Sequence, residues 1–423
     1  MHSRQVARWI GNALGLAVVL GTAVLLLLLW RAQREALPTL AQVRAWIENG
    51  HWEEASAAID RYLANGDRRS PVLFLAGRVR AAAGRYEEAL RFLEQIPQGV
   101  PDYLEAVFRR AQILRVIGRR RDSERLFKEL MDLGRQRNTP AALEFRRAAI
   151  YELVSMYSLE RRAREAIPLI WEVYPEHAEP WRLLIALARL QGEPVHIDEA
   201  VTELLAAVQA DEQDGISRRA LAWYYLKGGR FKEAAQMAHQ AVELLPEDWE
   251  ARAVLFEVYV AQQNFAAIDQ WLRSHPLPSQ APVAFWKVVA QACEGLGRLQ
   301  RAEHFYRKAL ELAPYDHRIH FALGGLLIRL GNKEEGQRHL ARFRALKEHY
   351  QAIQQFISEL GGDARAAEWS VPTPEKCLEL ARHCAGLGRR REAIGWSEMA
   401  LAQNPSFAPA ADYLEQLRTS SGS

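Results

Sequence analysis

The chain has 423 residues, of which 49% are hydrophobic and 25% are charged, and its formal net charge is only +3. This near balance argues against a nucleic-acid-binding protein, which needs a strongly basic surface, and three cysteines are too few for a disulfide framework. The sequence also lacks the glycine-rich, Cys-x-x-Cys and His-Glu-x-x-His motifs of phosphate, redox and metal sites. We therefore expect no enzyme activity, no cofactor, no metal ion, no nucleic-acid partner and no small-molecule substrate.

The first thirty residues carry the pattern of a membrane anchor. A short basic tail, residues 1–8, precedes the mainly apolar residues 9–30, which are long enough at about 1.5 Å per residue to cross a hydrocarbon core of about 30 Å. Trp9 and Trp30 stand at its two ends, where indole rings favour the membrane interface. The pattern predicts a transmembrane helix in the lipid bilayer, with a cleaved signal peptide as the alternative.

The predicted localisation is a single-pass membrane protein of a bacterial inner membrane. Basic residues are almost equally frequent on the two sides of residues 9–30, so the charge rule does not fix the orientation. A short basic start commonly acts as a signal anchor, and we therefore expect the rest of the chain on the extracytoplasmic side. The cytoplasmic side is the alternative.

From residue 36 to residue 360 the sequence repeats with a period of 34, seen in Gly84 and Gly118 and again in Gly297 and Gly331. In the copy at residues 283–314, apolar residues follow helical spacing before and after the glycine, and a proline closes the second helix. The apolar positions are Trp286, Val289, Ala290 and Cys293, then Leu299, Ala302, Tyr306 and Ala309. Weaker copies fill the gaps, one of them beginning near Ala178.

This pattern resembles the tetratricopeptide repeat (TPR) family, and with residues 9–30 it is similar to a membrane-anchored TPR protein. The resemblance implies an all-α, right-handed superhelical solenoid of about ten helix-turn-helix repeats. About nine repeats occupy residues 36–360, with an extended last helix. A linker at 361–373, a final repeat with a capping helix at 374–418 and a disordered tail at 419–423 complete the predicted order.

The resemblance also implies a concave groove, lined by the first helix of each repeat, in which protein partners bind. Arginine alternates with aromatic residues at the groove positions, which suits peptide segments with acidic and apolar side chains; ordinary surface residues are the alternative. The positions carried over are Phe74, Arg78, Phe108, Arg115, Tyr151, Ser155, Arg182, Arg189, Arg219 and Trp223.

Three arginine clusters, Arg119 to Arg121, Arg161 to Arg162 and Arg389 to Arg391, fall in the turns between paired helices. We interpret them as solvated turn charges; contact with an acidic partner or with anionic lipid is the alternative. His320 and the three cysteines occupy inward repeat positions and are interpreted as core residues, so the pair His317 and His320 is interpreted as structural, with a metal pair as the alternative.

The predicted function is a non-catalytic, membrane-anchored scaffold or adaptor that binds protein partners in the groove and assembles them at the membrane. The alternative is a constitutive accessory subunit of a membrane enzyme or secretion complex, with no free peptide-binding groove. Salt-sensitive binding would favour the first, and large apolar groove patches the second.

Overall fold

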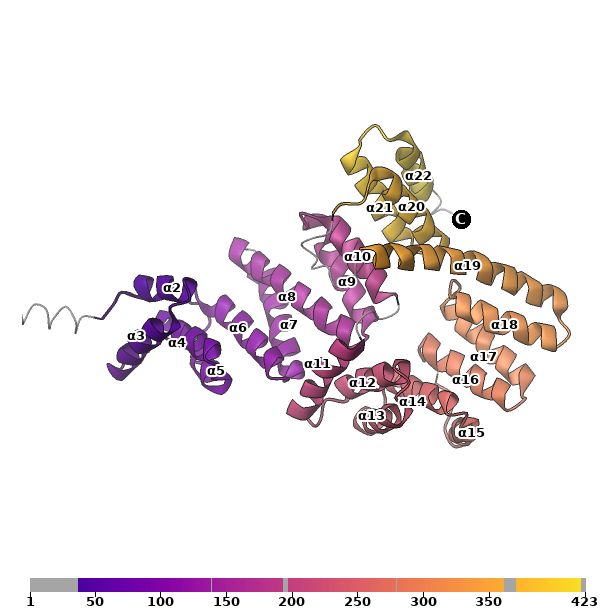
Figure 1. Cartoon of the computed structure of the whole chain (residues 1–423), viewed down its shortest axis with the longest axis horizontal. Helices are drawn as coiled ribbons and strands as arrows, with labels where there is room; N and C mark the ends of the chain where they lie inside the picture. Colours follow the sequence, from indigo (N-terminus) through magenta and orange to yellow (C-terminus); the bar gives the residue numbers. More distant parts are fainter. Residues whose placement is uncertain (1–36, 138, 193–196, 279, 361–369, 420–423) are drawn as a thin grey trace, which may run out of the picture. The chain divides into compact units, whose positions relative to one another are not determined.

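The computed structural model describes residues 37–137, 139–192, 197–278, 280–360 and 370–419. All regular structure in these ranges is helical, with 21 α-helices and one short 3-10 helix (Figure 1). Contacts between Cα atoms divide the chain into two compact units, Met1–Ile113 and Leu114–Ser423. The predicted all-α fold is confirmed for the part of the chain that the structure describes.

The first unit is held together by close helix pairs. Between α4 and α5 the contact is close because Gly77 has no side chain: an added Cβ would lie 2.5 Å from Cγ of Leu93. Arg80, only 6% exposed, pairs with Asp60 and, at 3.4 Å, with Glu88. The helices are α2 (Leu40–Glu48), α3 (Trp52–Ala64), α4 (Ser70–Ala82), α5 (Tyr86–Glu94) and, up to the boundary, α6 (Tyr103–Val116).

The second unit contains the remaining helices, and Figure 1 shows those from α12 to α18 following an arc with α13 and α15 on its outer edge. They are α7 (Arg120–Arg137), α8 (Pro140–Leu159), α9 (Ala163–Val173), η1 (Tyr174–Glu176), α10 (Pro180–Leu190), α11 (Ile197–Ala210), α12 (Gly215–Lys227), α13 (Phe231–Leu244), α14 (Trp249–Ala261), α15 (Phe265–Ser274), α16 (Val283–Gly295), α17 (Leu299–Leu312), α18 (His317–Arg329), α19 (Lys333–Glu359), α20 (Pro374–Gly386), α21 (Arg390–Gln403) and α22 (Ala408–Thr419).

Apolar stripes bury the paired helices against one another. One core cluster joins α14 to α18, and Trp286, Phe305 and Tyr306 in it are each at most 2% exposed. A second cluster joins α11 to α14 around Leu204 and Leu221. Each pair hides its apolar face only when the next pair stacks on it, which is the physical basis of a repeat array.

Most tight turns between paired helices place a residue in the left-handed region directly after the first helix. Glycine, which lacks a Cβ, takes this conformation readily, as Gly297 does with φ 73°. Arg161 after α8 and Gln263 after α14 occupy the same position with φ 58° and 57°. These are the non-glycine residues of the described chain that hold a positive φ.

The helices α10 and α11 do not pack as a pair, although the sequence predicts a repeat beginning near Ala178. Instead, α10 packs against α9, α19 and α21, whereas α11 packs against α12. The turn before α7 also approaches α11 closely, because a Cβ on Gly118 would lie 2.7 Å from the carbonyl oxygen of Ala206. The two helices of the predicted repeat, α10 and α11, therefore pack in different parts of the second unit.

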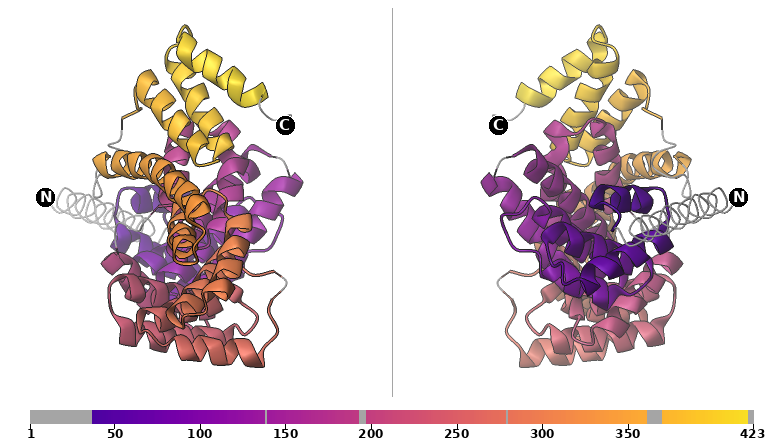
Figure 2. Two further views of the ribbon diagram at one scale, coloured as in Figure 1. Left: turned by 90° about the vertical axis from the view of Figure 1, so that its right-hand side faces the viewer. Right: turned by 90° about the vertical axis from the view of Figure 1, so that its left-hand side faces the viewer.

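The C-terminal repeat docks on α10, so helices about 200 residues apart in sequence are in contact (Figure 2). The side-chain amide of Gln191 donates to Glu392 Oε1 at 2.8 Å. Gly395 on α21 leaves room for Tyr174, whose hydroxyl oxygen would lie 2.8 Å from an added Cβ. The second unit therefore closes on itself instead of ending as an open array.

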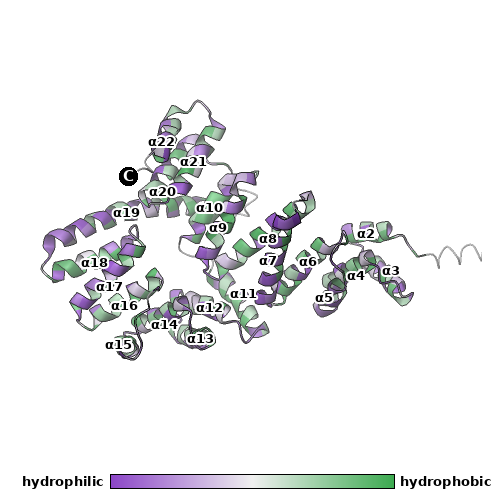
Figure 3. Cartoon of the chain, turned by 180° about the vertical axis from the view of Figure 1, so that it is seen from behind, coloured by the Kyte–Doolittle hydropathy of each residue, from purple (hydrophilic) through white to green (hydrophobic). Residues whose placement is uncertain are grey.

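The predicted localisation as a single-pass membrane protein is contradicted. Among the described residues, no helix is both long enough and apolar enough to span a bilayer. Apolar residues form stripes that neighbouring helices cover, and even α19, with 27 residues, is hydrophilic along much of its length (Figure 3). Residues 1–8, the predicted span 9–30 with Trp9 and Trp30, and most of 361–373 and 419–423 lie outside the described residues.

Two adjacent glycines on α18 should respond to alanine in opposite ways. A Cβ on Gly324 would lie 3.0 Å from the carbonyl oxygen of Gly336 on α19, whereas a Cβ on Gly325 meets nothing within 4 Å. We expect Gly324→Ala to lower the free energy of unfolding by about 1–3 kcal/mol through overpacking, and Gly325→Ala to raise it by about 0.5–1 kcal/mol. Urea unfolding followed by circular dichroism measures both; equal effects would contradict the packing of α18 on α19.

The docked C-terminal repeat should make stability depend on pH through Glu392. Burial raises the pKa of this carboxyl above its ordinary value of 4.5, so the native state binds the proton more tightly than the unfolded chain. Stability should increase as pH falls through the native pKa, and the whole gain is present below about 4.5. Glu392→Gln, which removes the charge, should raise the melting temperature by about 2 °C or more at pH 8 and change it little at pH 4.

The control is Glu398→Gln, because Glu398 lies on the same helix with its side chain 42% exposed and paired with Arg418. Thermal unfolding of both variants at the two pH values is the measurement. A lower melting temperature for Glu392→Gln at pH 8 would show that the buried charge stabilises the docked repeat.

Candidate partner-binding site

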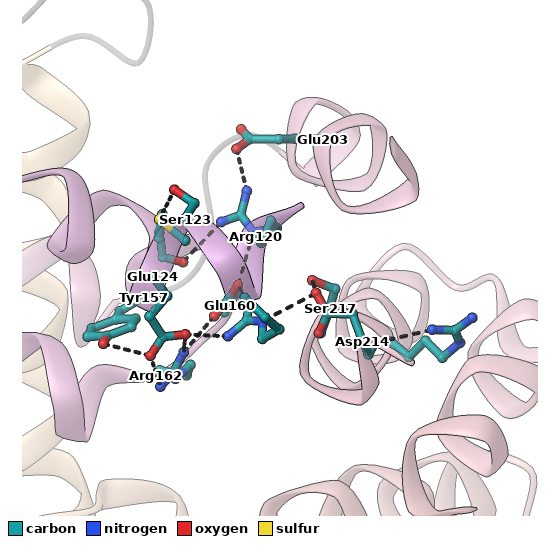
Figure 4. Close-up of polar contacts among 12 residues, drawn as sticks. Arg120, Ser123, Glu124, Tyr157, Glu160, Arg162, Glu203, Asp214 and Ser217 are labelled. Atoms are coloured by element: carbon teal, nitrogen blue, oxygen red, sulfur yellow. Dashed lines mark hydrogen bonds and ion pairs between the residues drawn. The ribbon is translucent and has the colours of Figure 1, made fainter. Parts of the chain in front are cut away.

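A buried ion network connects α7, α8 and α11 (Figure 4). Arg120, at the start of α7, is 1% exposed, and its Nε lies 2.9 Å from Oε1 of Glu160, which is 0% exposed. Its Nη1 lies 2.7 Å from Oε1 of Glu203 on α11. A guanidinium has five donors, so one residue can link carboxylates from two helices.

The same network extends to α12 through further arginines. Glu124 accepts from Arg121 at 2.5 Å, from Arg162 at 2.8 Å and from the hydroxyl of Tyr157 at 2.9 Å. Arg121 also pairs with Glu160, and its Nε lies 3.4 Å from Asp214, the residue that caps the N-terminus of α12. Charged side chains therefore link four helices, and Glu203 on α11, with its side chain 51% exposed, is the least buried of those named.

The electrostatics of the network keep the carboxylate of Glu124 ionised. Burial alone would raise the pKa of Glu124, but Arg162 and Lys128 outweigh burial and lower the pKa to about 2. Burial, together with Glu124, raises the pKa of Tyr157, so its hydroxyl stays a neutral donor. The stabilisation from Glu124 is present above the ordinary pKa of 4.5 and is lost as pH falls towards 2.

The interpretation of these arginines as solvated turn charges is wrong for Arg120 and Arg162, which are 1% and 9% exposed. It holds for Arg119, whose side chain is 44% exposed and pairs with Asp122 at 2.6 Å. Arg120 is buried because the predicted repeat is split, so that α11 and the start of α12 cover the turn between α6 and α7.

A pocket of about 390 Å³ lies between α10 and α11, where a paired repeat would have its helix contact. We name it the α10–α11 pocket. Its walls come from α8 and the turn after it, α10, α11, α12 and the end of α19. The lining residues are Ser155, Ser158, Leu159, Arg161, Ala186, Arg189, Leu190, Glu199, Ala200, Glu203, Tyr224, Gln354 and Ile357.

Three of the predicted groove residues belong to the first unit. Phe74 is 1% exposed and packs in the core, so it offers no contact surface to a partner. Arg78 and Phe108 are half-buried, and burial lowers the pKa of Arg78. We therefore leave Phe74 out of the proposed contact surface.

The predicted groove residues of the second unit are partly exposed, and several hold an intramolecular partner. Ser155 on α8 and Arg189 on α10, from different repeats, line the same α10–α11 pocket. Tyr151 is 39% exposed and packs edge-on against His177. The arginines pair with acids at Arg115–Glu152 (3.6 Å), Arg182–Glu179 (2.8 Å) and Arg219–Asp248 (2.7 Å), and Trp223 lies under Arg161.

The groove positions predicted from the sequence include neither Arg161 nor Tyr224, and contact of the cluster Arg161 to Arg162 with an acidic partner is only the alternative interpretation. A signal for Arg161 was present, because it occupies the turn position where glycine recurs along the chain. No sequence feature marked Tyr224 as a site residue, because its spacing along the helix is that of an ordinary core aromatic residue.

In the part of the chain that the structure describes, no group of three or more His, Cys, Asp or Glu side chains is placed to hold a metal ion. His320 Nδ1 instead lies 2.8 Å from His339 Nδ1, and Cys293, Cys377 and Cys384 are buried free thiols. Burial raises the pKa of the Cys377 thiol to about 12, so it stays protonated.

The network should respond strongly to loss of a single charge. Glu160→Gln keeps the side-chain shape but leaves three buried or half-buried arginines short of a negative charge, and we expect it to lower the free energy of unfolding by about 3 kcal/mol. Asp122→Asn, which breaks solvent-exposed pairs in the same region, should cost less than about 1 kcal/mol. Chemical denaturation of both variants is the measurement, and similar losses would contradict the assignment.

Residues 283–326 match a model of the tetratricopeptide repeat family. No curated protein sequence matches the chain. Among solved structures, a chain of the APC/C hetero-tetramer Cut9–Hcn1 is 12% identical, with 89% of this chain and 89% of that chain covered and a TM-score of 0.34. MamA from Desulfovibrio magneticus RS-1 is 16% identical over 36% of this chain and 86% of its own, with a TM-score of 0.30.

PilF of Pseudomonas aeruginosa is 13% identical over 52% of this chain and 90% of its own, with a TM-score of 0.32. TM-scores this low carry no argument about the function of this chain. The matched residues 283–326 contain α16 and α17 and most of α18, which pack as helix pairs of the predicted kind. The match therefore indicates a tetratricopeptide repeat at residues 283–326, on helices that pack in pairs.

Proposed function

We propose that this protein is a non-catalytic scaffold that binds segments of partner proteins on the groove side of the second unit. The proposed groove comprises Arg115, Tyr151, Ser155, Arg182, Arg189, Arg219 and Trp223. The observation that best supports it is the α10–α11 pocket, in which Ser155 and Arg189 from different repeats line one hollow. The TPR-like fold supports a protein-interaction role in general.

The chemistry of the groove favours partner segments with acidic and apolar side chains. Arg115 and Arg219 are held by Glu152 and Asp248, so their guanidinium groups are already oriented before a partner arrives. A partner carboxylate can share each guanidinium with the internal carboxylate, because a guanidinium has five N–H donors. Tyr151 and Trp223 add ring surface, which binds with little loss of side-chain entropy.

The test is affinity capture with the full chain, comparing the wild type with the double variant Arg115→Gln and Arg219→Gln. Glutamine is chosen over a charge reversal because each arginine lies beside a carboxylate, and a second negative charge there would disturb the fold. We expect the double variant to recover at least fivefold less partner, as counted by mass spectrometry. Recovery by the wild type should also fall with rising salt.

The matched control removes the same two charges from outward positions, with Arg125→Gln and Arg273→Gln, whose side chains are 75% and 69% exposed on α7 and α15. It should recover partners as the wild type does. Equal recovery by all three proteins would refute the groove, while equal loss in both variants would point to net charge instead of a defined surface.

A further inference from the structure

Arg161 forms the wall of the α10–α11 pocket in a conformation that its residue type disfavours. Its φ of 58° lies in the left-handed region, where a Cβ crowds the backbone and where most comparable turns of this chain use glycine, with Gln263 as the other exception. Such strain persists only where surrounding structure or function retains it. The presence of arginine at a position that favours glycine therefore needs an explanation in the contacts of its side chain.

The guanidinium group of Arg161 lies 4.4 Å from the ring centroid of Trp223. Among the described residues, no carboxylate lies within ion-pairing distance of it, unlike its neighbours Arg120, Arg121 and Arg162. Lys227 Nζ lies 5.3 Å from the same ring, so two cations share one aromatic surface. Stacking on a ring fixes the plane of a guanidinium while leaving its donors available.

A second polar group on the pocket wall also has unused bonding capacity. Tyr224 is 5% exposed, and its hydroxyl has no hydrogen-bond partner within the described ranges. Burial raises the pKa of Tyr224, so the hydroxyl remains a neutral donor. A neutral hydroxyl on the pocket wall can donate a hydrogen bond to an acceptor bound there.

The pocket lining carries two arginines, Arg161 and Arg189, and two carboxylates, Glu199 and Glu203. Glu203 is committed to the buried Arg120 at 2.7 Å, which leaves Glu199 as the remaining carboxylate of the lining. Leu190 and Ile357 provide an apolar wall from α10 and α19. The pocket therefore combines an available cation, an available hydroxyl donor and an apolar surface.

We propose that Arg161, together with Tyr224, binds the carboxylate of an acidic side chain of a partner protein, while a neighbouring apolar side chain of that partner packs against Leu190 and Ile357. The proposal rests on the scaffold function above and gives it a defined anion seat. Arg161 is the specificity residue of that seat, because it accepts a carboxylate and disfavours a cationic or amide side chain.

The experiment uses fluorescein-labelled synthetic peptides with alternating Asp and Leu, and matched peptides with Asn or Lys in place of Asp. Their affinities for the full chain are measured by fluorescence anisotropy at low salt. We expect the Asp peptide to bind about tenfold more tightly than the Asn peptide, as one charge-assisted hydrogen bond implies. In Arg161→Gly the affinity for the Asp peptide should fall by about tenfold, while the affinity for the Asn peptide stays unchanged.

Gln263→Gly is the matched control, because Gln263 has φ 57° at the equivalent turn after α14, away from the pocket lining. Both glycine variants relieve the same backbone strain, so both should melt at or above the wild-type temperature, yet only Arg161→Gly should lose binding. Equal affinity for the Asp and Asn peptides, no binding of the Asp peptide, or unchanged binding by Arg161→Gly would each overturn the proposal.

The double variant at Arg115 and Arg219 separates failure of the seat from failure of the scaffold function. If it weakens binding of the Asp peptide while Arg161→Gly does not, the groove stands and the seat is refuted. If neither variant changes binding, the groove assignment and the seat fail together.

Discussion

The second unit depends on the ion pair between Arg120 and Glu160. Both side chains are almost completely buried, and a buried charge without its partner costs several kcal/mol, so the fold must keep them together. Apolar burial is non-directional, whereas the contacts of Arg120 with Glu203 and of Arg121 with Asp214 join α7 to defined points on α11 and α12. The apolar stripes therefore provide most of the stabilising contacts of the solenoid, whereas the ion pairs determine which helices lie beside one another.

The position of α11 over the turn before α7 has consequences for α10. Its apolar residues need cover, and α19 and α21 provide it in place of α11. Gly192 and Gly395 allow this approach, because a Cβ on Gly192 would lie 2.7 Å from the side-chain amide of Gln354. The α10–α11 pocket is the space left between helices that took other partners, so the network and the candidate site have one structural origin.

Local features of the fold could be predicted from the sequence, since they depend on nearby residues. Gly297 and Pro314 predict the ends of α16 and α17, and the stripe around Trp286 predicts their buried faces. A helical stripe reports that a face is buried but not which helix covers it, and for this reason the separation of α10 from α11 could not be predicted.

In the candidate site, too, the sequence pattern could not predict which side chains other helices cover. Arg119 and Arg120 are adjacent members of one arginine run, yet their side chains are 44% and 1% exposed, because α11 covers only one of them. Phe74 was assigned to the groove by repeat position but lies in the core of its unit. Arg161 lies at a position that the period assigns to glycine, and only the pocket gives that exception a chemical meaning.

The contact between α10 and α21 also constrains how the chain is made. In most repeat arrays each unit is completed by its neighbour, so folding can follow synthesis closely. Here Gln191 contacts Glu392, which lies 201 residues later in the chain. A ribosome needs on the order of 10–40 s to synthesise that length at 5–20 residues per second. During that interval Leu184 and the surrounding face of α10 lack the cover that α21 provides in the folded chain, and an apolar face exposed in this way promotes aggregation of a nascent protein.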